Sequence, residues 1–209
     1  MSGTNISSNT EEEINSPLIN FCREYALMLT SGGIVLVGGL SRSGKTTLAN
    51  NLRQIVLERG LNAWTLSIDM WLRNIDSRLP GVLGRYDLSI MRDVISFHYT
   101  KERGSYNLQL PLYDKLQQRS IGTDQSILIH PTDILIIEGT VALTLATNLN
   151  NINRLYVAVD ELLRKQRVIN EYLSRGKSIS EANTIYAERQ IDETPVVEKS
   201  AVGVQRFCM

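Results

Sequence analysis

The sequence is poor in cysteine and has no surplus of charge of either sign. Its 209 residues include two cysteines, Cys22 and Cys208, which form no CxxC pair and no cluster with histidine. A disulfide framework or a zinc site needs more ligands at closer spacing, so we expect two free thiols in a reducing compartment. Basic and acidic side chains number 22 each. That balance argues against the broad basic face of a nucleic-acid-binding protein.

Long apolar runs are also lacking. No stretch approaches the roughly 20 apolar residues that a membrane-spanning helix requires. Residues 1–16 are polar and acidic, unlike a targeting peptide, and their content of Ser, Asn, Thr and Glu predicts a disordered tail. We therefore expect a cytoplasmic protein with neither membrane nor nucleic acid as partner. The remaining length suits one domain, residues 17–209.

Short β-branched runs alternate with segments of helical periodicity. Apolar runs bounded by glycine predict buried strands, and apolar positions three or four apart predict helices. This alternation is typical of βαβ units around a mainly parallel sheet, hence of the α/β class. The predicted strands are residues 34–37, 63–68, 134–137 and 155–159; the predicted helices are residues 17–30, 45–59, 88–101 and 161–174, with Asp160 as the cap of the last.

One stretch, residues 39–46, fits the phosphate-binding pattern G-x-x-x-x-G-K-[ST]. Glycines let successive N–H groups turn inward, and the following helix offers its positive end to an anion. Lys45 would reach the β- and γ-phosphates of ATP, and the Thr46 hydroxyl would hold Mg²⁺. An ordinary glycine-rich turn is the alternative, but the flanking strand and helix favour a P-loop. The predicted nucleotide-binding residues are Gly39, Ser41, Ser43, Gly44, Lys45, Thr46 and Thr47.

Two acidic residues follow predicted strands, and no NKxD motif of a regulatory GTPase is present. Parallel strands deliver their carboxyl ends to one edge, so Glu138 and Asp69 should both face the P-loop. Glu138 and Asp69 would complete a Mg²⁺ site with Thr46, and Asp69 would orient an acceptor hydroxyl and take its proton. The alternatives are that Asp69 caps the next helix and that Glu138 only ends its strand.

Together these segments resemble the uridine kinase and phosphoribulokinase superfamily of P-loop kinases, nearest its uridine–cytidine kinase branch. The resemblance implies a three-layer P-loop fold with an acceptor-binding insertion at about residues 70–130 and a small lid at about residues 164–190. The matching segments, spread over roughly residues 33–177, are GGLSRSGKTT, SIDMW, RYD, LPLYD, DILIIEG, VAVDELLRKQRV and SRGK.

The resemblance also implies roles for single residues. Asp69 matches the family's catalytic base, and Asp87 an aspartate that holds ribose hydroxyls. Tyr113 matches an aromatic residue of the acceptor pocket. Arg164 and Arg167 match a pair that clamps the donor phosphates as catalytic groups; because they are three apart they can share a helix face. A solvated basic surface is the alternative for that pair.

The chain departs from the family around the acceptor. Gln118 stands where a histidine is usual, although it could replace that histidine as a hydrogen-bond partner. Lys115 stands where an aromatic residue is expected, and Leu88 and Ser89 replace a His-Pro pair. The sequence predicts an ATP- and Mg²⁺-dependent kinase, with a nucleoside such as uridine or cytidine preferred as acceptor. One alternative is a kinase with a sugar, glycerate or pantothenate-like acceptor. The other is a regulator that binds a nucleotide without turnover. Homo-oligomerisation is left open.

Overall fold

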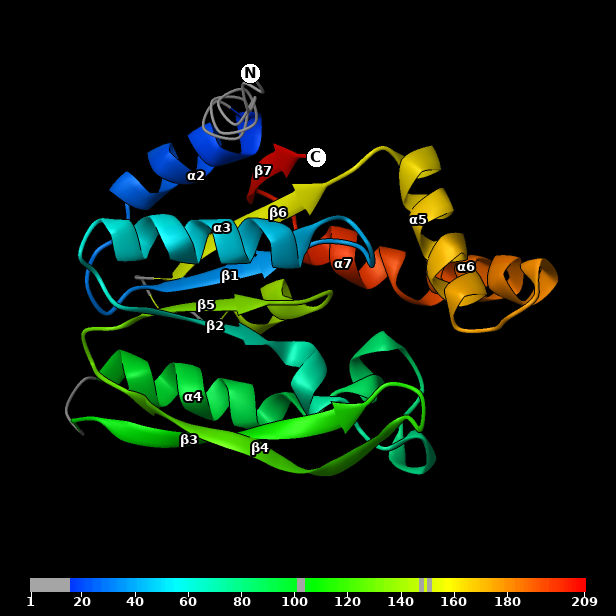
Figure 1. Cartoon of the computed structure of the whole chain (residues 1–209), viewed down its shortest axis with the longest axis horizontal. Coiled ribbons are helices and arrows are strands. Elements are labelled where there is room, and N and C mark those ends of the chain that lie inside the picture. Colours follow the sequence, from blue (N-terminus) through cyan, green and yellow to red (C-terminus); the bar gives the residue numbers. More distant parts are fainter. Residues whose placement is uncertain (1–15, 101–103, 147–148, 150–151) are drawn as a thin grey trace, which may run out of the picture.

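The structure, a computed structural model, describes residues 16–100, 104–146, 149 and 152–209. The predicted tail lies outside these residues except for Ser16. At the centre is a five-stranded sheet in the order β2-β5-β1-β6-β7, in which every neighbouring pair is parallel (Figure 1). The predicted parallel α/β fold is therefore confirmed. The strands are β1 (Ile34–Gly38), β2 (Ala63–Ser67), β5 (Ile134–Glu138), β6 (Ile152–Ala158) and β7 (Gln205–Cys208).

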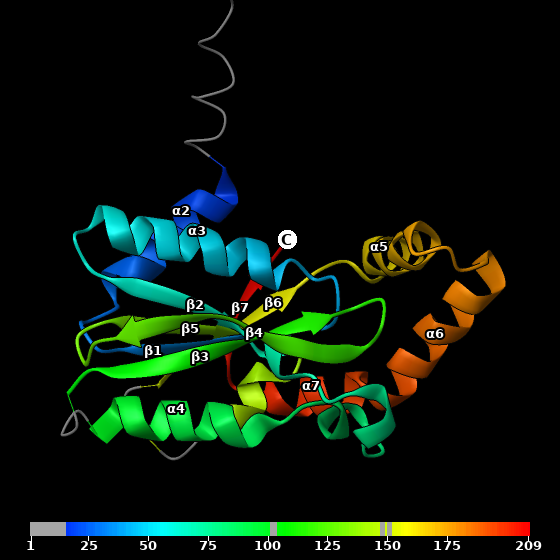
Figure 2. The ribbon, with the colours of Figure 1, turned by 60° about the horizontal axis from the view of Figure 1, so that its bottom comes forward.

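Helices cover both faces of this sheet, which makes three layers (Figure 2). Val35 and Val37 of β1 pack toward α2 (Pro17–Leu27) and α3 (Lys45–Glu58). Ile34 and Leu36 alternate with them and join the core on the other face. That core also takes residues of α4 (Leu88–Thr100) and α7 (Thr194–Ser200). Because both faces are buried, β1 and β5 read as continuous apolar runs, and for that reason they could be predicted.

A two-stranded antiparallel hairpin lies beside α4 and was not among the predicted strands. It consists of β3 (Tyr106–Asp114) and β4 (Arg119–Ile129), joined by the turn 115–118. Its register shifts at Leu110/Pro111, so the alternating apolar pattern is interrupted there. The hairpin falls within the predicted insertion at residues 70–130. It carries Tyr113 and the turn toward the carboxyl edge of the main sheet.

Two helices extend past that edge, where the lid at residues 164–190 was predicted (Figure 2). They are α5 (Glu161–Ser174) and α6 (Ile179–Asp192), together called the α5–α6 arm. Asp160 caps α5 as predicted, since its Oδ1 accepts the N–H groups of Leu162 and Leu163 at 3.0 Å each. α6 begins in a capping box formed by Ser178 and Glu181.

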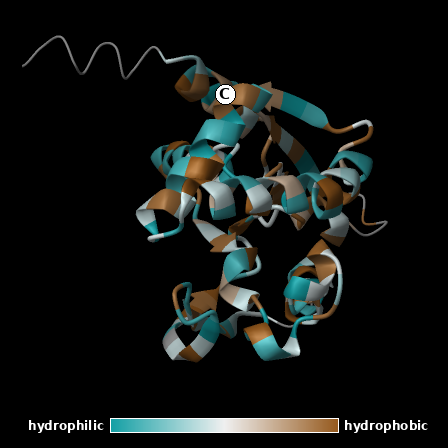
Figure 3. Cartoon of the chain, turned by 90° about the vertical axis from the view of Figure 1, so that its right-hand side faces the viewer, coloured by the Kyte–Doolittle hydropathy of each residue, from teal (hydrophilic) through white to brown (hydrophobic). Residues whose placement is uncertain are grey.

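Element ends differ from the predictions by a few residues. The strand predicted at 63–68 ends at Ser67, where a 3₁₀ helix, η1 (Ile68–Trp71), begins. The strand predicted at 155–159 runs from Ile152 to Ala158. Further 3₁₀ turns are η2 (Ile75–Ser77), η3 (Val82–Arg85) and η4 (Ala142–Leu145). Figure 3, viewed from the side of the arm, shows hydrophobic and hydrophilic residues mixed along the helices. No helix in the described ranges has the length and hydropathy needed to cross a bilayer.

Candidate active site

The P-loop connects the end of β1 to the start of α3, and its glycines are required by close contacts. A Cβ on Gly39, whose φ is +148°, would lie 2.4 Å from the carbonyl oxygen of Val157. Gly44 has φ +101°, a region that favours glycine, and it precedes Lys45 at the start of α3. No side chain caps this helix end. Its first N–H groups are therefore left for a ligand.

Buried polar atoms of the loop fit a phosphate chain. The hydroxyls of Ser41 and Ser43 are buried, and neither has a hydrogen-bond partner among the described residues. The Lys45 ammonium donates to the carbonyl of Leu40 at 2.8 Å. Burial lowers the pKa of Lys45, whereas nearby carboxylates, first Glu138, raise it. Of these two serines only Ser41 lines the cavity with Lys45, and a buried cation beside an unpartnered hydroxyl and helix N–H groups is a suitable environment for bound phosphate oxygens.

Two carboxylates stand at the same edge of the sheet, as the order of strands requires. Glu138 ends β5, is 3% exposed and pairs in register with Val37 of β1 on one side and Ser67 of β2 on the other. Burial raises the pKa of Glu138, while hydrogen bonds to Ser67 and Thr46 lower it. Glu138 and the Thr46 hydroxyl therefore adjoin each other, and oxygen ligands of this kind suit Mg²⁺ beside phosphates.

Asp69 follows β2, one strand further from the P-loop than Glu138. It lies in the first turn of η1, whose N-cap residue is Ser67 and not Asp69. Instead its Oδ2 lies 3.4 Å from the ammonium of Lys115, in the hairpin turn, and the Asp69 side chain is 40% exposed. Asp69 therefore does not cap η1, which was the alternative role expected for it.

One cavity of about 850 Å³ spans the P-loop, the carboxylates and the hairpin turn. Its volume lies within the roughly 300–1,000 Å³ typical of small-molecule sites. The predicted site residues that line it are Ser41, Gly44, Lys45, Thr46, Thr47, Asp69, Tyr113, Gln118, Glu138 and Arg167. Nucleotide-binding and acceptor-binding candidates therefore face the same space.

Four predicted site residues do not line the cavity: Gly39, Ser43, Asp87 and Arg164. The Asp87 Oδ1 accepts the N–H and hydroxyl of Ser89 at 3.3 and 2.5 Å, at the start of α4. The hydroxyl bond is the main cause that lowers the pKa of Asp87. Arg73 lies 3.9 Å from the same oxygen.

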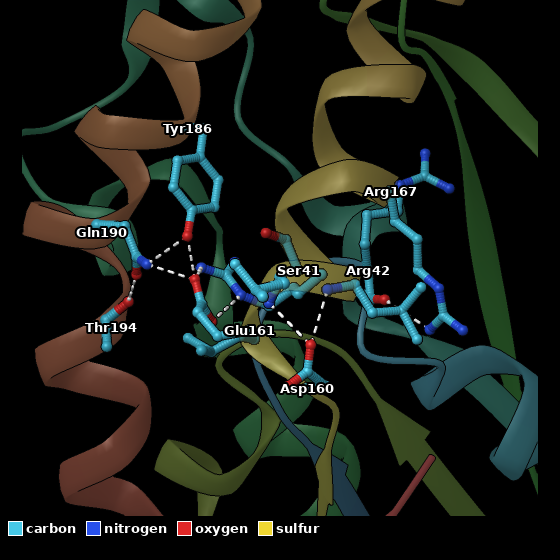
Figure 4. Close-up of polar contacts among 12 residues, drawn as sticks. Ser41, Arg42, Asp160, Glu161, Arg167, Tyr186, Gln190 and Thr194 are labelled. Carbon is cyan, nitrogen blue, oxygen red and sulfur yellow. Dashed lines mark hydrogen bonds and ion pairs between the residues drawn. The ribbon is translucent and has the colours of Figure 1, made fainter.

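Arg164 and Arg167 both lie on α5 but contact different groups; Figure 4 labels Arg167 and its neighbour Arg42. Arg164 is 1% exposed and makes a bidentate pair with Glu161, at 2.8 and 2.9 Å. Its guanidinium also lies 5.2 Å from the centre of the Tyr186 ring. Arg167 instead donates to the carbonyl of Arg42 in the P-loop, at 3.4 Å. Only Arg167 of this pair reaches the cavity.

Glu161 is the centre of a polar network that joins α5 to α6 and α7 (Figure 4). Its Oε1 accepts hydrogen bonds from the hydroxyl of Tyr186 and from Gln190, the latter at 2.5 Å. Thr194, the first residue of α7, donates to Gln190 at 2.6 Å. The side-chain bond from Arg164 is the first cause that lowers the pKa of Glu161. The network fixes the arm to the helix that follows it.

Several cavity residues were missed by the sequence reasoning. Glu193, 2% exposed, accepts the N–H of Ser41 at 2.7 Å and lies 3.6 Å from Arg189. No local pattern predicts a contact across 152 positions. Arg78 and Arg85 line the acceptor side; a concentration of arginine between β2 and α4 was the available signal. Among the residues described, no group of three or more His, Cys, Asp or Glu could hold a metal.

Comparisons with known proteins place the chain among kinases. No protein-family model matches. A uridine kinase of Limosilactobacillus reuteri is 27% identical over 159 residues, 73% of this chain and 71% of that protein. A Silicibacter protein provisionally named a fructose transport system kinase has a TM-score of 0.65 at 18% identity, covering 92% of this chain and all of that one. D-glycerate 3-kinase from Cryptococcus neoformans has a TM-score of 0.58 at 12% identity, with 99% and 96% covered.

The two structural similarities show the shared fold, and the sequence similarity extends over 73% of this chain. By sequence and by fold, the chain resembles the uridine kinase and phosphoribulokinase superfamily of P-loop kinases.

Proposed function

We propose that this protein is a cytoplasmic kinase that transfers the γ-phosphoryl group of ATP to a hydroxyl of a small metabolite. The observation that carries the proposal is the single cavity in which Lys45 and the P-loop face Asp69. A protein that only sensed ATP would not need a carboxylate on the side where an acceptor enters. The kinase relatives, which act on different acceptors by name, support the reaction class.

The P-loop would bind the phosphoryl donor, ATP. Its N–H groups and Lys45 would hold the β- and γ-phosphates, and Arg167 would stabilise charge on the transferring group. Thr46, Glu138 and Asp69 would hold Mg²⁺, which when bound neutralises phosphate charge. Lys45 and Glu138 are buried before ATP arrives, so their orientation costs little at the moment of transfer.

Asp69 would act on the acceptor hydroxyl. Its carboxylate would accept a hydrogen bond from the acceptor hydroxyl in place of Lys115, 3.4 Å away. As the new O–P bond forms and the bond to ADP breaks, the hydroxyl proton passes to Asp69. Tyr113 and Gln118 line the same cavity and would position the acceptor.

A nucleoside such as uridine or cytidine is the first candidate acceptor, supported by the uridine kinase relative. Asp87, the expected ribose contact, does not line the cavity. Its position supports the second candidate, another hydroxylated metabolite such as a sugar or a hydroxy acid. A regulator that binds ATP without turnover is the remaining rival.

The test is ADP release by the full chain with Mg²⁺ and ATP, compared across nucleosides, sugars and hydroxy acids. We expect release that depends on an added acceptor and is lost in Lys45→Ala. ATP binding without acceptor-dependent release in any of the three classes would instead favour the regulator.

A further inference from the structure

The cations that line the cavity differ in whether a carboxylate neutralises them. Most form an ion pair: Arg42 and Arg175 with Glu171, Arg85 with Asp192, Lys115 with Asp69, and Arg189 with Glu193. Among the described residues, the lining cations that form no ion pair are Lys45, Arg167 and Arg78. Lys45 and Arg167 lie at the P-loop, where the phosphates of a nucleotide would neutralise them. Arg78 has no such counterpart.

Arg78 is held in place by neutral groups only. Its Nη1 donates to Oε1 of Gln118 at 3.0 Å, its Nη2 to the hydroxyl of Tyr113 at 2.8 Å, and its Nε to the carbonyl of Arg73 at 3.3 Å. A guanidinium has five N–H donors, so these three bonds leave one free donor on each terminal nitrogen. The side chain is therefore oriented by its surroundings while its charge remains uncompensated.

Two free donors on neighbouring nitrogens match the oxygens of a carboxylate or phosphate in a bidentate pair. The position of Arg78 relative to Asp69 follows from the hairpin turn 115–118. Lys115, at the start of the turn, contacts Asp69, and Gln118, at its end, contacts Arg78. Asp114 and Arg119 are paired across the strands, so the two ends of the turn lie close together. Asp69 and Arg78 therefore line the same cavity beside the two ends of one turn.

We propose that the acceptor carries an anionic group, a carboxylate or a phosphate, and that Arg78 binds this group while Asp69 receives the hydroxyl. The inference rests on the proposed kinase function and narrows its substrate class. It assigns Tyr113 and Gln118 the task of positioning Arg78, in place of reading a base.

The first experiment compares acceptors that differ only in charge. ADP release is measured with glycerol, glycerate and glycerol phosphate, and with ribose, ribonate and ribose 5-phosphate, with uridine as the nucleoside reference. We expect kcat/KM at least about tenfold higher for one anionic member of a set than for its neutral member, because hydrogen bonds to charged groups are the stronger ones. The carboxylate and phosphate arms show which anion the site takes.

Variants then assign the effect to Arg78. Arg78→Gln should lower kcat/KM for the preferred anion about tenfold or more, a much larger loss than for the neutral acceptors, and leave ATP affinity within about twofold. Arg119→Gln is the matched control, since Arg119 is on the same hairpin, bonds to Gln117 and does not line the cavity. Circular dichroism of both variants shows whether the fold is kept, and Arg78→Lys tests charge without the planar fork.

Calorimetric titration of the same compounds in saturating ADP, which keeps them from the P-loop, measures binding without turnover. Anion binding that depends on Arg78 but brings no ADP release would overturn the kinase function and leave the anion site. Equal turnover of neutral and anionic acceptors, unaffected by Arg78→Gln, would overturn the anion site and leave the kinase. If no anionic probe is bound and none is turned over, the proposed anion site at Arg78 is also overturned.

Discussion

At the scale of single residues, burial separates groups that the sequence presents as equivalent. Arg164 and Arg167 are one pattern in the sequence, yet one is buried against Glu161 and the other reaches the P-loop. Cys22 and Cys208 were both expected to be free thiols, and both are. Cys22 is buried in the layer formed by α2 and α3, whereas Cys208 is exposed. Their chemistry should differ accordingly.

We expect one thiol to react in the native protein and two after denaturation. Burial raises the pKa of Cys22 to about 11, so near neutral pH its reactive thiolate is scarce as well as shielded. Mass spectrometry after iodoacetamide treatment locates the label, and Cys208→Ser should abolish native labelling. Rapid native labelling of Cys22 would contradict its burial.

The arginine pair gives a second prediction at this scale. Arg167→Gln should raise the KM for ATP about tenfold with little change in the free energy of unfolding, because its side chain is exposed at the P-loop. Arg164→Gln should lower the free energy of unfolding by about 2 kcal/mol, through loss of its bidentate pair with Glu161. Urea unfolding and steady-state kinetics of both variants check this. If Arg164→Gln has normal stability but a raised KM for ATP, this prediction is wrong and Arg164 binds the donor phosphates.

At the scale of elements, the α5–α6 arm touches the P-loop through its end. Glu193 follows α6 and precedes α7, and its carboxylate takes the N–H of Ser41. That N–H belongs to the loop whose donors serve the phosphate chain, so a bound nucleotide and Glu193 lie close together. Arg189, one helical turn earlier, partly neutralises Glu193.

We expect Glu193→Gln to bind ATP about three- to tenfold more tightly. The amide oxygen can still accept the Ser41 N–H, while the negative charge beside the phosphates is removed, a change of roughly 1 kcal/mol at a partly screened site. Glu198→Gln is the matched control, because Glu198 of α7 pairs with Arg206 of β7 and does not line the cavity. Calorimetry measures both affinities. Weaker ATP binding by Glu193→Gln alone would mean that the carboxylate holds the loop in its binding form.

At the scale of the whole molecule, the sequence predicted the elements that have a local apolar pattern and missed elements that lack one. β1 and β5 are buried on both faces, so their residues form apolar runs that indicate strands. β7 was missed because its four residues are mostly exposed, and α6 because only Ala182 of its fourteen residues is buried. Neither element shows the periodicity on which such predictions depend.

The site divides in the same way. The P-loop, Glu138 and Asp69 could be predicted, because a glycine pattern and strand ends place them from local sequence. Arg78 and Glu193 could not, because Arg78 is positioned by a hairpin turn 40 residues away and Glu193 meets a loop 152 residues earlier. Asp87 and Arg164 matched family motifs but do not line the cavity. Their hydrogen bonds to Ser89 and Glu161 hold them in other positions.

The central claim is that Asp69 acts on the acceptor while the P-loop holds ATP, and Asp69→Asn tests it most directly. A general base contributes roughly 10²- to 10⁴-fold, so kcat with the best acceptor should fall at least about hundredfold. The Kd of ATP measured without Mg²⁺ should stay within about twofold, and Asp76→Asn, a change to an exposed carboxylate of η2 outside the cavity, should alter neither kcat nor this Kd. Turnover of Asp69→Asn equal to that of the unchanged protein would contradict the account.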